Sequence, residues 1–135
     1  MVMQVDLVSP EGAVYSAEAT MVVARSADGD IAFQTGHVPF VGVLQADRVK
    51  VFLTDGSEQL IAVHRGFVEV STDKVTILSD VAELAEHLDA ERARAALERA
   101  REAIAANIEA GPEIFFDKLK AETRLKVHNT FMGHD

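Results

Sequence analysis

The stretch Leu88-Asp89-Ala90-Glu91-Arg92-Ala93 decides how the chain is organised, because the sequence pattern changes there. Before it, short runs of β-branched and aromatic residues alternate with turn residues, which is typical of strands. After it, alanine, arginine and glutamate recur with the spacing of amphipathic helices. We therefore predict a β domain over residues 1–84 and a helical tail over residues 85–135.

About nine or ten short strands are predicted in the β domain, with the turn spacing of an antiparallel sandwich or barrel. Asp55-Gly56 is the clearest hairpin signal, because this pair tolerates the backbone angles of a tight turn. Residues 14–19 and 21–24 are predicted as two separate strands. The other predicted strands lie at or near residues 4–9, 31–33, 41–44, 49–53, 59–63, 67–70 and 74–78.

The tail is predicted to form two helices, over residues 88–110 and 113–128. Asp89 stands at the expected N-cap of the first helix, and Gly111-Pro112 should end it. The second helix should bury Phe115, Leu119 and Val127, or Phe116 and Leu119. Both apolar stripes are narrow and rich in alanine, so we expect the tail to pack weakly and to be the less stable part.

The composition excludes several classes of protein. The net charge is −9, and the β domain has 12 acidic against five basic residues. Such an acidic surface argues against binding nucleic acid or anionic lipid directly. The chain has no cysteine, and it shows neither a signal peptide nor an apolar run long enough for a membrane span. We expect a soluble protein of a reducing compartment.

Motifs for catalysis and for metal binding are missing. The five histidines form neither a His-x-His pair nor a His-Glu-x-x-His motif, so no metal site is predicted. There is no phosphate-binding glycine loop and no Gly-x-Ser-x-Gly elbow. His37 is expected to be a loop residue whose ring bonds to backbone groups near Pro39. We therefore expect a protein that is not itself an enzyme.

Leu88-Asp89-x-x-Arg92-Ala93 offers a candidate binding site at the start of the tail. Helical spacing brings Asp89, Arg92 and Arg99 near one face of the first helix. A carboxylate can accept from an adenine amine or a ribose hydroxyl, and arginine suits phosphate. The alternative is structural: Asp89 only caps the helix and Arg92 is solvated. Spacing alone leaves both interpretations open.

Four basic residues mark the second tail helix, with only one acid among them: Lys118, Lys120, Arg124 and Lys126. They could form a positive surface that docks onto an acidic partner. They could equally be a solvated helix flank whose ion-pair partners are Glu113 and Asp117.

A series of short motifs, taken in order over essentially the whole chain, resembles the epsilon subunit of bacterial-type ATP synthases. Residues 6–11 resemble the first strand and turn of that family, and residues 28–40 its glycine loop and Gly-His-x-Pro signature. Residues 66–80 resemble the strand pair that closes its sandwich. Leu88-Asp89-x-x-Arg92-Ala93 is similar to its nucleotide-binding element. Ala32, Thr35 and Arg65 depart from the usual glycine, proline and glycine of the family.

The resemblance implies a mainly β fold with added helices: a flattened ten-stranded antiparallel β-sandwich followed by a C-terminal two-helix hairpin. It implies a non-catalytic rotor subunit in the central stalk of a proton-translocating ATP synthase, peripheral to the cytoplasmic face of the inner membrane. The implied partners are the gamma subunit, the c-subunit ring and, through the tail, the alpha/beta catalytic head. An extended tail would inhibit ATP hydrolysis, and regulatory ATP would favour the folded tail.

With this resemblance, the candidate ATP-binding residues are Glu83, Leu88, Asp89, Arg92, Ala93 and Arg99. The candidate partner-binding residues are Gly36, His37, Pro39, Lys118, Lys120, Arg124 and Lys126. No cofactor is expected to be required. The alternative function is a free-standing β-sandwich module that senses a nucleotide without any synthase contact. A small barrel enzyme of the cupin type would need clustered histidines, which the sequence lacks.

Overall fold

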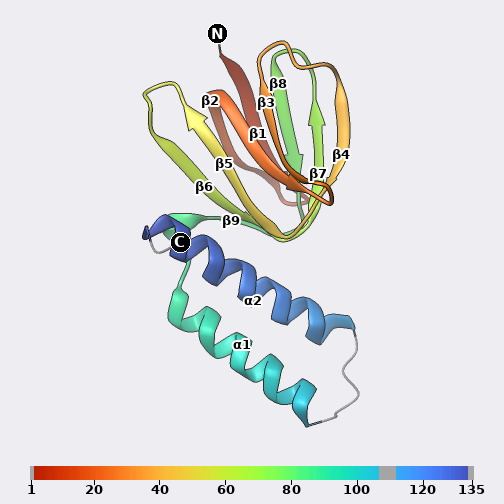
Figure 1. Cartoon of the computed structure of the whole chain (residues 1–135), viewed down its shortest axis with the longest axis vertical. Coiled ribbons are helices and arrows are strands. Elements are labelled where there is room, and N and C mark those ends of the chain that lie inside the picture. Colours follow the sequence, from red (N-terminus) through yellow and green to blue (C-terminus); the bar gives the residue numbers. More distant parts are fainter. Residues whose placement is uncertain (1, 107–111, 134–135) are drawn as a thin grey trace.

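The computed structural model describes residues 2–106 and 112–133 (Figure 1). These residues form a β-sandwich with a helical hairpin at one end, so the predicted fold class is confirmed. The elements are β1 (Met3–Ser9), β2 (Gly12–Ser26), β3 (Gly29–Gln34), β4 (Phe40–Leu44), β5 (Asp47–Leu53), β6 (Glu58–Val63), β7 (Gly66–Val70), β8 (Lys74–Leu78), β9 (Ala82–Leu84), the 3-10 helix η1 (Ala85–His87), α1 (Ala90–Ala105) and α2 (Pro112–Phe131).

Strand β2 joins the two layers of the sandwich. Its first half pairs with β1, which continues through β8 and β7 to β4. Its second half lies between β3 and β5, and β5 continues through β6 to β9. The pairing register with β5 shifts between Ala19 and Met21. The predicted break between two strands is therefore wrong, because the irregularity interrupts the pairing without ending the strand.

The described residues contain nine strands, which agrees with the nine or ten predicted from the pattern and is one fewer than the ten implied by the resemblance. The strands themselves differ in two places: residues 14–24 lie in a single strand, and the short β9 was not predicted. Strands β1 and β8 pair in parallel, whereas the other pairs are antiparallel. The predicted hairpin at Asp55-Gly56 is confirmed: it connects β5 and β6, and Gly56 has a φ of 89°.

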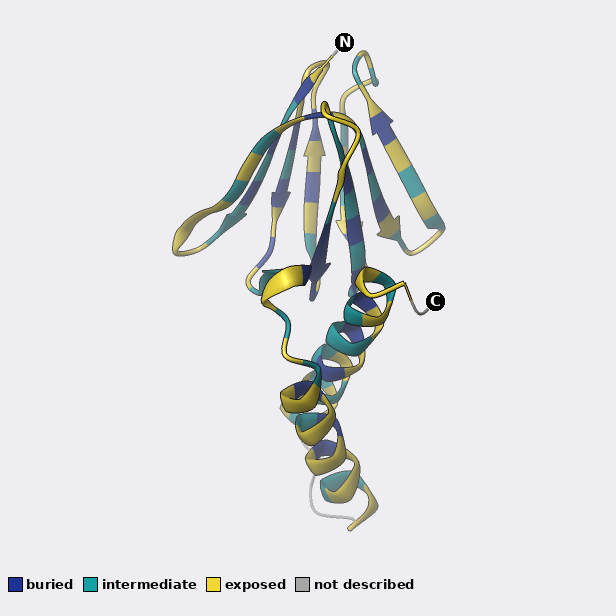
Figure 2. Ribbon diagram, turned by 90° about the vertical axis from the view of Figure 1, so that its left-hand side faces the viewer, coloured by how far each residue is buried: buried dark blue, intermediate teal, exposed yellow. Residues whose placement is uncertain are grey.

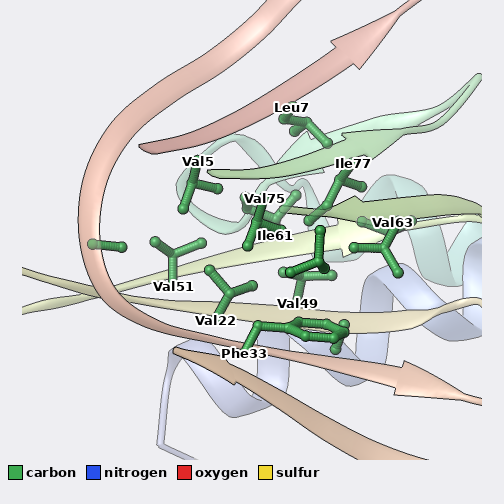
Figure 3. Packing of buried hydrophobic residues seen from close by; sticks show 14 of the residues in the cluster. Val5, Leu7, Val22, Phe33, Val49, Val51, Ile61, Val63, Val75 and Ile77 are labelled. Atoms are coloured by element: carbon green, nitrogen blue, oxygen red, sulfur yellow. The ribbon is translucent and has the colours of Figure 1, made fainter. Parts of the chain in front are cut away.

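The core lies between the two layers and consists mostly of valine, leucine and isoleucine (Figure 3). Burial alternates along β1 and β5, as expected when one face of a strand packs inward. Phe33 of β3 is fully buried among these aliphatic side chains. The alternating pattern that predicted the strands is thus the pattern that fills the core.

Strand β6 differs from the other strands because it is buried on both faces. Ile61 and Val63 belong to the sandwich core. Leu60 and Ala62 instead form a second cluster with Val127 of α2 and with Ala85. Helix α2 therefore covers the outer face of β6, and α1 packs on the far side of α2 (Figures 1 and 2).

Both helices occur as predicted, with different boundaries. Helix α1 begins at Ala90, and Asp89 is its N-cap because its side chain accepts from the Arg92 N–H at 3.1 Å. It ends at Ala105, so the predicted continuation to Ala110 lies partly outside the described residues, as does the predicted stop at Gly111. Pro112 is the first residue of α2, a position that proline favours since no N–H bond is lost there.

The predicted apolar side of α2 is confirmed for Val127 and wrong for Phe115 and Leu119. Val127 is buried together with Ala121 and Thr123. Phe115 and Leu119 are exposed, and Phe116 is half-buried. The helix is oriented by its contact with β6, where small side chains permit a close approach. Phe115 and Leu119 lie outside that contact.

Arg65, which departs from the glycine implied by the resemblance, adopts the backbone conformation that glycine favours. Its φ is 116°, a region that L residues rarely occupy. The following Gly66 cannot carry a side chain without overlapping the Leu78 carbonyl oxygen. The Arg65 guanidinium lies 3.9 Å from the centre of the Phe116 ring, so this turn also contacts α2.

Candidate functional site

A cavity of about 410 Å³ lies where β9 and the start of α1 meet α2. It is lined by Glu83, His87, Asp89, Arg92, Ala93, Ala96, Arg99 and Arg124. Five of the six residues predicted to bind ATP are therefore brought together. The sixth, Leu88, packs against the apolar cluster beneath β6 instead.

The charges around this cavity come from three elements. Arg92 and Arg99 project from α1, Arg124 from α2, and Glu83 from β9. Three guanidinium groups thus face one cavity that also has two carboxylates, Glu83 and Asp89. Guanidinium forks match phosphate oxygens, whereas carboxylates accept from hydroxyl and amine groups. The arrangement can hold a ligand that has an anionic part and a hydrogen-bond-donating part.

Glu83 connects the β domain to α2. Its Oε1 accepts from Nε2 of the buried His64 at 3.1 Å and from Nε of Arg124 at 2.6 Å. The His64 hydrogen bond is the main reason that the pKa of Glu83 is lowered to about 2. Burial opposes the shift, and Arg124 reinforces it through its hydrogen bond and charge. Glu83 is therefore ionised at neutral pH and acts as an acceptor.

Lys126 makes a second polar contact between α2 and the β domain. Its Nζ donates to Oδ2 of Asp47 at 2.8 Å. The Asp47 side chain is only 7% exposed, and Arg48 and Arg25 lie 3.7 and 4.0 Å from its oxygens. Burial alone would raise the pKa of Asp47, but the hydrogen bonds from Lys126 and the Arg48 backbone outweigh it and lower the pKa.

The four basic residues predicted for partner binding thus have different surroundings. Arg124 and Lys126 are directed at carboxylates of the β domain. Lys120 pairs with Asp117, one of the two ion-pair partners expected for a helix flank, at 3.3 Å. Lys118 is half-buried on the same helix. Two of the four basic residues, Arg124 and Lys126, therefore form ion pairs with the β domain and do not belong to one positive surface.

The loop with Gly36, His37 and Pro39 lies at the end of the sandwich opposite the hairpin (Figure 1). Gly36 has a φ of 89°, and its N–H donates to the Thr72 carbonyl at 2.8 Å. The His37 ring donates from Nδ1 to the Val38 carbonyl at 2.7 Å and lies against Phe33. This confirms the expected backbone contact of His37 and shows a loop held by local bonds.

An exposed apolar row crosses the outer face of β4, β7 and β8. Val43 pairs with Phe67, and Phe67 pairs with Leu78, so the three side chains are neighbours across adjacent strands. They are 60%, 55% and 40% exposed. Phe67 and Leu78 also line a cavity of about 450 Å³ that includes Val8 and Pro10. An apolar surface of this kind is characteristic of a protein contact site.

Sequence reasoning missed three features of these sites. His87 and Ala96 line the cavity beside the predicted residues, and Arg124 lines it although it was assigned to partner binding. The sequence patterns predict the three strands of the apolar row but not that its side chains are exposed. The alternation in β4 could have indicated this exposure, because Val41 and Val43 occupy alternate positions that face away from the core. Arg124 comes from a helix 41 residues after Glu83, a separation that local spacing does not reveal.

Neither a cluster of three metal-ligating side chains nor a helix able to span a membrane occurs in the described part of the chain. No group of three histidine or acidic side chains lies close enough together there to hold a metal ion. Neither α1 nor α2 is both long enough and apolar enough to span a bilayer.

Comparison with known proteins finds a family model described as ATP synthase, Delta/Epsilon chain, beta-sandwich domain, which matches residues 2–85. Three similar relatives are each named ATP synthase epsilon chain. That of Bacillus subtilis is 46% identical over 73% of this chain and 74% of its own length. That of Streptomyces griseus is 43% identical over 73% and 80%. That of Shouchella clausii is 37% identical over 91% and 86%.

Two solved structures have similar folds at low sequence identity. A chain in the mitochondrial ATP synthase of Euglena gracilis, solved as OSCP/F1/c-ring, superposes with a TM-score of 0.72 at 20% identity. The match covers 98% of this chain and 80% of that one. A chain in the central stalk/c-ring of the Tetrahymena thermophila enzyme gives a TM-score of 0.52 at 14% identity, covering 96% and 95%. At these identities the similarity establishes the fold.

Acid should weaken the fold through Glu83. Its pKa is lowered from 4.5 to about 2, so its stabilising contribution is complete above about pH 4.5 and is lost as the pH falls towards 2. We expect the wild-type chain to resist urea better than Glu83→Gln at pH 6, and this advantage to shrink at pH 3. A difference in unfolding free energy that is the same at both pH values would contradict the prediction.

Proposed function

The chain belongs to the epsilon-chain family of ATP synthases, and from this premise we propose that it is a non-catalytic rotor subunit. The β domain would link the gamma subunit to the c-subunit ring, so that ion flow turns the central stalk. The subunit would lie peripherally at the cytoplasmic face of the membrane, held there by the complex. The match of the family model to residues 2–85 is the observation that carries the proposal.

We propose the apolar row as the contact site for the gamma subunit. Its exposed residues, Val43, Phe67 and Leu78, cover parts of three adjacent strands, so they offer a broad and rigid surface. The neighbouring cavity between β1, β7 and β8 could take an apolar side chain of the partner. Deep apolar contacts of this kind supply most of the binding energy in stable interfaces.

The loop around His37 is the proposed contact with the c-subunit ring. It lies at the opposite end of the sandwich from the hairpin, so the two ends can reach different neighbours at the same time (Figure 1). Its backbone bonds to Gln34 and Thr72 hold it in place. A loop fixed in this way is suited to transmit force to a neighbouring subunit.

The hairpin is the proposed regulatory part, and ATP is its proposed ligand. In the docked hairpin, Arg92, Arg99 and Arg124 face one cavity with Glu83, which suits a ligand that has both a triphosphate and a nucleoside. Because α1 and α2 both contribute arginines, ATP would bind the docked hairpin better than an extended one. That differential affinity would shift the tail towards the state that permits ATP hydrolysis.

Charge in the apolar row should prevent assembly. Burying an unpaired carboxylate in an apolar contact is costly, so Phe67→Asp should abolish retention of the chain by immobilised gamma subunit. Val14→Asp is the matched control, because Val14 is an exposed valine outside the row. We expect the control to bind like the wild-type chain. Equal retention of Phe67→Asp would rule out this surface, and failure of the wild-type chain to bind would favour the free-standing module.

Removal of a cavity arginine should weaken ATP binding. We expect Arg92→Ala or Arg99→Ala to raise the Kd for ATP about tenfold, the typical effect of losing one charged hydrogen bond. Arg94→Ala is the control, because Arg94 lies on the same helix, is exposed and does not line the cavity. Titration calorimetry on the full chain measures all three. Equal losses in all three variants would indicate general charge attraction instead of a site.

Removal of α2 should relieve inhibition. We propose that the extended tail blocks the alpha/beta catalytic head, so deleting residues 112–135 should raise ATP hydrolysis by the assembled complex. The docking contacts of α2 with Asp47 and Glu83 would be lost without harm to the sandwich core. Hydrolysis that is unchanged, in a complex with normal subunit composition, would show that the tail does not act as a brake.

A further inference from the structure

His64 lies behind the cavity and does not line it. It follows β6 directly, its side chain is 1% exposed, and its backbone N–H donates to the Val81 carbonyl at 3.1 Å. The ring contacts Glu83 through Nε2. Its Nδ1 is buried and has no hydrogen-bond partner among the described residues. A buried histidine with a single polar contact, aimed at a cavity carboxylate, needs an explanation beyond packing.

We propose that His64 is a positioning residue of the nucleotide cavity, holding Glu83 by Oε1 so that Oε2 can accept from a nucleoside hydroxyl or amine. This inference rests on the proposed binding of ATP. Both donors to Glu83, His64 and Arg124, use the same oxygen atom. No hydrogen bond from another described residue engages Oε2, and Glu83 lines the cavity. The second oxygen is therefore the one available to a ligand.

The contact between His64 and Glu83 would also allow Arg124 to leave Glu83 and bind a phosphate. In the structure, Arg124 pairs with Glu83 at 2.6 Å, although a phosphate would attract the same guanidinium. If Arg124 turned towards phosphate with no other donor present, a half-buried carboxylate would lose its only hydrogen bond from the described residues. His64 keeps that hydrogen bond, so Glu83 can stay ionised and in place while Arg124 changes partner. The assignment requires that the hydrogen of the imidazole on the Glu83 side is on Nε2.

The test compares His64→Gln and His64→Leu by titration calorimetry of the full chain with ATP and with inorganic tripolyphosphate. A glutamine side chain can still donate from its amide nitrogen at nearly the same reach, whereas leucine fills the space without a donor. We expect His64→Leu to bind ATP about tenfold more weakly, and His64→Gln to remain within about threefold of wild type. Tripolyphosphate has no nucleoside, so its Kd should change less than about twofold in either variant.

Two controls separate positioning from a purely structural role. In a Glu83→Ala background, His64→Leu should cause no further loss of ATP affinity, because the residue acts through Glu83. The ¹⁵N spectrum of the wild-type imidazole should show a hydrogen on Nε2, a measurement that does not depend on any variant folding. A hydrogen on Nδ1 alone would overturn the inference.

The remaining outcomes are also decisive. Equal ATP affinity of His64→Leu and the wild type would overturn the role of His64 while leaving the nucleotide site intact. Equal weakening of ATP and tripolyphosphate by His64→Leu would assign His64 to structure alone and overturn the inference. If the wild-type chain binds no ATP, the proposed nucleotide function fails, and the positioning role fails with it.

Discussion

Strand β6 must bury side chains on both of its faces, and the arrangement of the molecule follows from this requirement. Ile61 and Val63 complete the sandwich core, while Leu60 and Ala62 need a cover that the β domain does not supply. Helix α2 supplies it with little apolar surface, chiefly Val127. Two ion pairs, from Arg124 to Glu83 and from Lys126 to Asp47, add to this contact. A docked hairpin held by so few contacts is suited to respond to a ligand.

The sandwich was largely predictable from the sequence because its signal is local. Alternating apolar residues, together with Asp55-Gly56, located most strands, since each pattern spans only a few neighbouring positions. The predictions that failed concern features that depend on residues distant in the sequence. The continuity of β2 past Ala19 depends on its neighbouring strands, and the orientation of α2 is set by β6 rather than by the size of Phe115 and Leu119. Tertiary contacts overrode the helix pattern there.

The residues of the candidate site likewise fall into those that local spacing could predict and those that it could not. Asp89, Arg92 and Arg99 could be grouped from helical spacing, and the structure places them around one cavity. Arg124 and His64 enter the site from an independent helix and from the end of a strand, and no spacing rule connects them with Glu83. Their carboxylate partner was among the predicted residues only through the family resemblance. The chemistry of a local motif is therefore readable in advance, whereas the side chains that support it are known only when the chain is folded.

Because β2 passes from one layer to the other, it affects how the sandwich responds to force. Strand β2 belongs to both layers, so the two sheets are connected by a covalent backbone as well as by the packing of their side chains. A load on the β4–β7–β8 layer reaches the β5–β6 layer along that strand and its hydrogen-bonded neighbours. The layers cannot slide past each other without breaking these bonds. The sandwich is therefore expected to resist shear between its two layers.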